Sequence, residues 1–105
     1  MSERVRTAMA LDAIDDVVDR CCEVAVEQVR TSGHLQVELK YDIFGAVNEA
    51  SVIYGVDLDN LLKEAWVELR NRLDRTLRGV CEVAYVKPYQ KDGMTVGMQA
   101  KVYRF

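Results

Sequence analysis

The stretch from Asp57 to Gly79 constrains the fold most, because it carries the clearest helical pattern in the chain. An apolar residue recurs there at every fourth position, which places these side chains on one face of a helix. The positions are Leu61, Ala65, Leu69, Leu73 and Leu77. Asp57 is suited to cap the first turn, and Gly79 to end the last turn in a left-handed conformation. We expect the rest of the chain to pack on this helix.

The composition predicts a single globular domain over residues 1–105. Half of the 105 residues are apolar and 30% are charged, as in packed rather than disordered chains. A domain of this size buries only a modest part of its surface, so a partner chain would stabilise it. No apolar run approaches the length of a membrane span, and the first residues lack the apolar region of a signal peptide. We therefore expect a soluble, cytoplasmic protein with no membrane partner.

The charged residues are distributed unevenly along the chain. The net charge is −3, but residues 1–60 carry twelve acids and five bases, whereas residues 61–105 carry nine bases and five acids. Such asymmetry can orient subunits head to tail or direct a basic edge toward an anionic ligand. Charges that only keep the surface hydrated are the simpler interpretation.

Cysteine and histidine usage argues against several kinds of site. The three cysteines are an odd number, and Cys21 and Cys22 are adjacent, so we expect reduced thiols in the core. His34 is the only histidine, which argues against a histidine-based zinc site and a Ser-His-Asp triad.

Residues 7–31 are predicted to form one long amphipathic helix. The apolar positions alternate by three and four residues, a spacing that suits packing against another helix. They are Leu11, Ile14, Val18, Cys21 and Ala25. The sequence Thr31-Ser32-Gly33 is expected to end this helix.

Residues 34–54 allow two interpretations. Apolar and polar residues alternate strictly from Leu35 to Ile43, which is typical of a strand. The same stretch also places Leu39, Ile43 and Val47 on one face of a helix that continues to Tyr54. We favour the helix, because the pattern from Phe44 onward is helical and joins smoothly, and keep a strand over 35–43 as the alternative.

A β-hairpin is predicted at the C-terminal end, where the period changes to two. Val80–Tyr89 and Thr95–Phe105 read as strands, and Asp92-Gly93 is a strong two-residue turn. Such a turn would place Tyr89 opposite Val96, Lys87 opposite Met98, Tyr85 opposite Ala100 and Val83 opposite Val102. Pro88 requires an edge or a bulge nearby. The predicted fold class is α+β: a three-helix core followed by a C-terminal antiparallel hairpin.

Two acidic pairs are the candidates for chemistry. Glu23 and Glu27 lie one turn apart, and so do Glu38 and Asp42 if residues 34–54 are helical. Four carboxylates from two antiparallel helices could hold Mg²⁺, which prefers oxygen ligands. Acids one turn apart on an exposed helix face are also common without any such role.

The run from Glu38 to Phe44, followed by Gly55-Val56-Asp57-Leu58, resembles the third helix and the following turn of the all-alpha NTP pyrophosphohydrolases (MazG-like). The resemblance covers roughly residues 20–70. It implies Mg²⁺-dependent removal of pyrophosphate from nucleoside triphosphates in a helical dimer or tetramer, with the metal on Glu23, Glu27, Glu38 and Asp42. The chain departs from the family in acid spacing, since Glu23 and Glu27 are four residues apart instead of three.

The main functional prediction is a small, self-associating protein-interaction module that acts by docking, as a regulator or inhibitor, without catalysis or cofactor. Aromatic and bulky residues on the last helix and the hairpin are the predicted interaction residues. They are Trp66, Tyr85, Tyr89, Met98, Tyr103 and Phe105. Lysines interleaved with these tyrosines could hold single-stranded nucleic acid, but the acidic composition argues against that partner. The alternative function is the Mg²⁺-dependent pyrophosphohydrolase.

Overall fold

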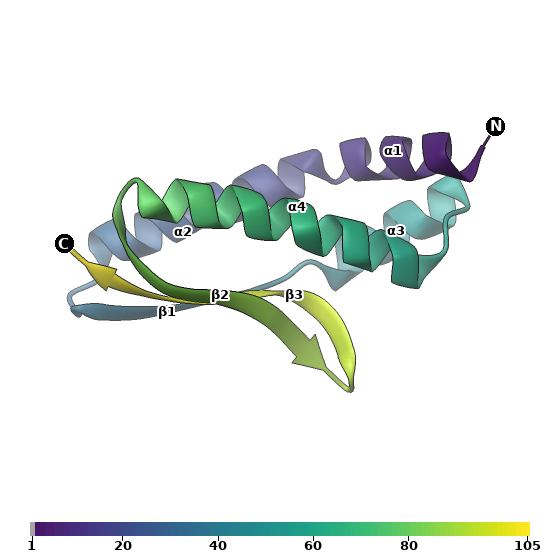
Figure 1. The fold of residues 1–105 in the computed structure, drawn as a ribbon. Coiled ribbons are helices and arrows are strands. Elements are labelled where there is room, and N and C mark those ends of the chain that lie inside the picture. Colours follow the sequence, from purple (N-terminus) through teal and green to yellow (C-terminus); the bar gives the residue numbers. More distant parts are fainter. Residues whose placement is uncertain (1) are drawn as a thin grey trace.

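The computed structural model describes residues 2–105 and has an α+β fold, in which helices cover one face of a three-stranded antiparallel sheet (Figure 1). The elements in chain order are α1 (Glu3–Ala13), α2 (Asp15–Thr31), β1 (Gln36–Asp42), α3 (Phe44–Tyr54), α4 (Leu58–Arg78), β2 (Cys81–Lys91) and β3 (Met94–Arg104). The strand order is β1-β3-β2, so β3 is central and both neighbours are edges. The predicted fold class is confirmed, with β1 as the third strand of the sheet.

Helix α4 forms as its sequence pattern predicts. All five residues of the apolar stripe are completely buried. The carboxylate of Asp57 accepts a hydrogen bond from the backbone N–H of Asn60 at 3.1 Å, which caps the first turn. Gly79 does end the helix, but the left-handed prediction is wrong, because its φ is −77°. The chain turns there instead with a 3.0 Å hydrogen bond from the Val80 N–H to the Leu77 carbonyl.

The prediction of one continuous helix over residues 7–31 is wrong at Ile14. This residue has φ −98° and ψ 4°, and it separates α1 from α2. The break lets the two segments pack on different partners, since α1 lies mainly against α3 and α2 lies mainly against α4. Ile14 itself is buried, as are Ala10 and Val18, so the apolar stripe continues through the bend. The regular apolar pattern therefore forms two helices, because its first part is buried against α3 and its second part against α4.

The preferred helical interpretation of residues 34–54 is wrong for the first part. Residues 36–42 form β1, which pairs antiparallel with β3 from Gln36–Tyr103 to Asp42–Gly97. The pairing with a strand about 60 residues later satisfies the backbone groups of β1 that face β3, and no local pattern reveals it. The helix begins only at Phe44, whose N–H donates to Asp42 Oδ1 at 2.9 Å. Gly55, with φ 64°, ends it in the left-handed conformation.

The hairpin forms around Asp92-Gly93 as predicted, but its register shifts twice. The Val83–Val102 pair is confirmed, whereas the other three predicted pairs are wrong by one residue. Tyr89, Lys87 and Tyr85 lie opposite Gly97, Gln99 and Lys101. The shift arises next to Tyr89, where β3 carries the extra residue Val96, and it is reversed at Ala84, an extra residue in β2. The edge strand and the nearby bulge both agree with the constraint predicted from Pro88.

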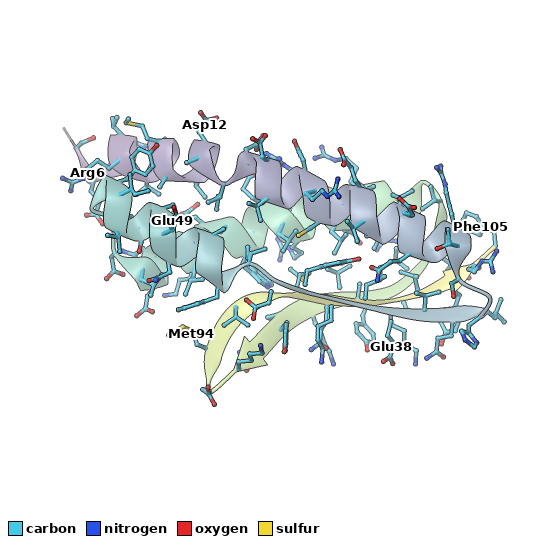
Figure 2. The ribbon with its side chains drawn as sticks, turned by 180° about the vertical axis from the view of Figure 1, so that it is seen from behind. Arg6, Asp12, Glu38, Glu49, Met94 and Phe105 are labelled. Atoms are coloured by element: carbon cyan, nitrogen blue, oxygen red, sulfur yellow. The ribbon has the colours of Figure 1, made fainter. Side chains whose placement is uncertain are left out.

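The sheet has a buried inner face and an uncovered outer face. Leu39, Met98, Ala100 and Val102 lie on the inner face under the helices and are buried. Glu38 lies on the outer face, and Figure 2 shows its side chain pointing away from the helices. Within residues 2–105, no helix combines the length and the apolar character that crossing a bilayer requires.

Candidate functional site

The structure does not bring the four predicted metal ligands together. Glu23 and Glu27 lie on α2, and Glu38 and Asp42 lie on the outer face of β1. Asp42 is already engaged, because its Oδ2 lies 3.2 Å from Lys91 Nζ. Across residues 2–105, no three His, Cys, Asp or Glu side chains gather closely enough to hold a metal ion. The helical pairing of Glu38 with Asp42 fails because both residues belong to a strand.

Of the predicted interaction residues, three tyrosines share the outer face of the sheet, and Met98 does not reach any surface. Tyr85, Tyr89 and Tyr103 face outward, whereas Met98 is completely buried on the inner face opposite Tyr41 and Pro88. Interaction through Met98 therefore does not fit its position. Phe105 is 89% exposed at the end of the sheet.

The outer face is built from tyrosines that contact lysines. Lys40 Nζ lies 4.7 Å from the ring centre of Tyr89, and Lys87 Nζ lies 4.8 Å from that of Tyr85. Lys40 on β1 pairs with Gln99 and Tyr89 on β2 pairs with Gly97, so this contact runs diagonally across β3. Such cation–π contacts at exposed sites are worth about 0.5–1 kcal/mol each. These contacts place lysine ammonium groups over the tyrosine rings, so the outer face presents charge to the solvent although no helix covers it.

Trp66, the remaining predicted interaction residue, lines a groove between α4 and the tip of the β2–β3 hairpin. The groove has a volume of about 620 Å³. Its lining residues are Asp59, Leu62, Lys63, Trp66, Val67, Pro88, Asp92, Gly93, Met94 and Thr95. The Arg70 guanidinium lies 4.7 Å from the indole ring centre, and the indole nitrogen is buried without a hydrogen-bond partner among the described residues. We call this feature the Trp66 groove.

Four exposed aliphatic residues lie on α1 and α3. Val5 and Met9 of α1 are 47% and 41% exposed, and Val52 and Ile53 of α3 are 75% and 64% exposed. The two helices pack on each other at the end of the molecule that holds the N-terminus (Figure 1). We call these four residues the α1–α3 patch. The sequence pattern did not single them out, although the single charge in α3, Glu49, was a usable signal.

Arg72 is the centre of a polar network that joins α4 to α2. Its guanidinium bonds to Asp15, lies 2.8 Å from Asp19 Oδ1 and lies 3.4 Å from Glu68 Oε2. The hydrogen bond to Asp15, followed by the charge of Asp15 and the contact with Asp19, raises the pKa of Arg72. Because one guanidinium bridges carboxylates of α2 and α4, the network links the two helices while its acids remain partly exposed.

The thiols are placed to be unreactive. Cys22 and Cys81 are buried and Cys21 is partly buried, and none of them forms a disulfide. Burial raises the pKa of all three thiols, so little reactive thiolate is present at neutral pH. The predicted reduced state in the core is consistent with this placement.

No family model, curated protein or solved structure matches this chain. The resemblance to the pyrophosphohydrolases stays a prediction, and the strand at Gln36–Asp42 stands where that family has a helix. The Trp66 groove and the α1–α3 patch are the two candidate binding surfaces of the described residues.

Proposed function

We propose that this chain is a protein-interaction module that associates with a second copy of itself through the α1–α3 patch. The observation that carries the proposal is the exposure of two consecutive aliphatic residues, Val52 at 75% and Ile53 at 64%. Removing one such side chain from water contributes roughly 1.5–3 kcal/mol. Exposed aliphatic side chains at neighbouring positions are typical of interfaces.

The composition of α3 supports a covered position for this helix. Its sequence, FGAVNEASVIY, contains one charged residue, Glu49. Helices with so few charges are usually buried on most sides. Here Val47 and Ala50 pack into the core, whereas Val52 and Ile53 face outward. A partner surface would bury Val52 and Ile53, the aliphatic residues of α3 that the chain itself leaves exposed.

A second copy is the partner that the local charges favour. A two-fold interface places the same patch on both sides, so like charges within the patch would repel each other. The patch itself carries no charge, so two copies can meet there without like-charge repulsion between patch residues. The modest core of a chain of 105 residues would also benefit from this additional burial.

The experiment compares the molar mass of the parent chain with that of Val52→Lys and Ile53→Lys by light scattering during gel filtration. We expect a dimer for the parent and a monomer for both variants, because each places a hydrated ammonium in an apolar interface. Lysine should not disturb α3, since the side chain introduced by Ile53→Lys would lie one turn after Glu49 and pair with it.

Leu35→Lys is the matched control, because Leu35 is 70% exposed but lies outside the patch. It should leave the dimer intact. A monomeric parent, or a dimer that survives both patch variants, would reject the proposal.

A further inference from the structure

We propose that the Trp66 groove is a binding site for an uncharged, mainly apolar small molecule. The volume of about 620 Å³ lies within the range of roughly 300–1,000 Å³ that is typical of small-molecule pockets. One wall comes from α4 and the other from the hairpin tip, where Figure 2 labels Met94. The site shares no residue with the α1–α3 patch, so this inference holds independently of self-association.

The side chains that would contact a ligand are mostly apolar. Leu62, Trp66 and Val67 come from α4, and Pro88 and Met94 come from the hairpin. Trp66 offers a large rigid surface, and Met94 can adjust its shape to different ligands. Burying apolar ligand surface against these groups supplies the main binding energy.

The charged residues around the groove select against ionised ligands. Asp59 and Lys63 lie one turn apart on α4 and offset each other, and Asp92 at the hairpin turn adds one further negative charge. An anion would therefore meet a slightly negative rim. A cation would meet apolar walls that provide no buried counter-charge, and it would lose its hydration at a high cost. An uncharged molecule avoids both penalties.

The indole N–H of Trp66 provides a second, independent observation. Its nitrogen is buried without a hydrogen-bond partner within residues 2–105. Proteins rarely leave a buried donor unpaired, because the lost hydration is not replaced. This donor belongs to a residue that lines the groove. The ligand class is an uncharged, mainly apolar molecule.

The test uses N-phenyl-1-naphthylamine, an uncharged aromatic probe whose fluorescence rises in apolar sites. Trp66 is the only tryptophan in the chain, so energy transfer from its emission to the probe reports binding to the chain, and the groove variants below locate the site. We expect saturable binding with one probe per chain, together with quenching of the Trp66 emission.

Val67→Lys and Met94→Lys place a charge in the groove wall. Val67 is 38% exposed on α4, so the first substitution should leave the fold intact, which circular dichroism would verify. Each variant should weaken probe binding by roughly tenfold or more. Leu35→Lys is the matched control, because it introduces the same charge at an exposed aliphatic position outside both the groove and the α1–α3 patch. It should bind the probe as the parent does.

Three results would overturn the inference. The first is the absence of saturable binding, and the second is unchanged affinity in both groove variants. The third is loss of the dimer in Val67→Lys, which would show that a second copy occupies the groove. Loss of the dimer in Val52→Lys alone, with probe binding retained, would support both proposals separately.

Discussion

The α-carbon of Gly97 lies directly against the backbone of Tyr41. A Cβ placed on Gly97 would come within 1.7 Å of the Tyr41 carbonyl oxygen and 2.7 Å of its carbonyl carbon. Both neighbours are backbone atoms, which cannot rotate away as a side chain could. The end of β1 can therefore approach the centre of the sheet only because position 97 has no side chain.

Gly97→Ala should destabilise the fold strongly. Overpacking a well-packed site typically costs about 1–3 kcal/mol, and a clash with backbone belongs at or above the upper end of this range. The free energy of unfolding from urea denaturation, followed by circular dichroism, measures the loss.

Gly45→Ala is the matched control for this substitution. Gly45 is the second residue of α3, and a Cβ there would meet no atom within 4 Å. Alanine should therefore stabilise the helix, by at most about 0.5–1 kcal/mol. If Gly97→Ala changed the free energy of unfolding as little as Gly45→Ala does, the close approach of β1 to Gly97 would be contradicted.

The sequence predicts α4 well because its signals are local. The stripe from Leu61 to Leu77 repeats over several turns, and Asp57 stands where the capping bond forms. The Asp92-Gly93 turn is equally local, since two consecutive positive φ values require such residues. No distant partner is needed to define either element.

β1 and the hairpin register depend on distant residues and so could not be read from local patterns. Residues 36–42 fit a helix or a strand, and only pairing with β3 decides between them. The register shift at Val96 likewise has no local cause. It places Gly97, instead of Val96, opposite Tyr89, and the backbone of Tyr41 packs against Gly97 on the other side of β3. A bulge of this kind is specified by packing between strands.

The candidate sites follow the same division. Trp66 was recognised from its place beside the stripe of α4, but the groove also needs Pro88 and Met94 from the hairpin. The possible convergence of the acids on α2 with Glu38 and Asp42 depends on residues 34–54 being one helix, and Gln36–Asp42 is a strand. Arg72 was not recognised as a centre, because Asp15 and Asp19 lie more than 50 residues away in sequence.

Arg72→Met should destabilise the fold by roughly 1–2 kcal/mol. Methionine keeps the apolar stem of the side chain, so the change removes mainly the charge. Asp15, Asp19 and Glu68 would then repel one another without a shared cation. These carboxylates are partly exposed, with 41%, 56% and 50% of their side-chain surface accessible, so water limits each pair to under about 1 kcal/mol.

Urea denaturation at low and high NaCl measures this effect, and the difference between parent and variant should shrink with salt. Arg78→Met is the control, because Arg78 is exposed and pairs with Asp74 alone. It should leave the midpoint nearly unchanged. If Arg72→Met lowers the free energy of unfolding as little as the control does, the network does not stabilise the fold.

Asp57→Ala should cost about 1 kcal/mol by removing the cap of α4. The carboxylate now accepts the Asn60 N–H at 3.1 Å, and alanine leaves this donor to water. Thermal unfolding followed by circular dichroism measures the change. Asp59→Ala removes the same charge from the first turn without removing the bond, so a clearly smaller loss is expected. Equal losses would mean that the helix dipole, and not the cap, accounts for the effect.

Tyr41 should make the stability of the fold fall at alkaline pH. Burial between β1 and α2 raises the pKa of Tyr41 from 10.0 to about 12, with Cys21 and Cys22 adding to the shift, while its hydroxyl donates to Gln28. The folded state therefore holds this proton more tightly than the unfolded state. Stability from this group is fully present below pH 10.0 and is lost as the pH rises toward about 12.

Two measurements test this behaviour of Tyr41. Ultraviolet titration of the five tyrosines should show one that ionises last, and this step should be missing in Tyr41→Phe. Denaturation between pH 9 and pH 11, a range chosen to straddle the ordinary tyrosine pKa of about 10, should show a steeper decline for the parent than for Tyr41→Phe. Tyr85→Phe, on the outer face of the sheet, is the control and should decline as the parent does. Parallel curves for all three proteins would show that the Tyr41 hydroxyl does not link folding to pH.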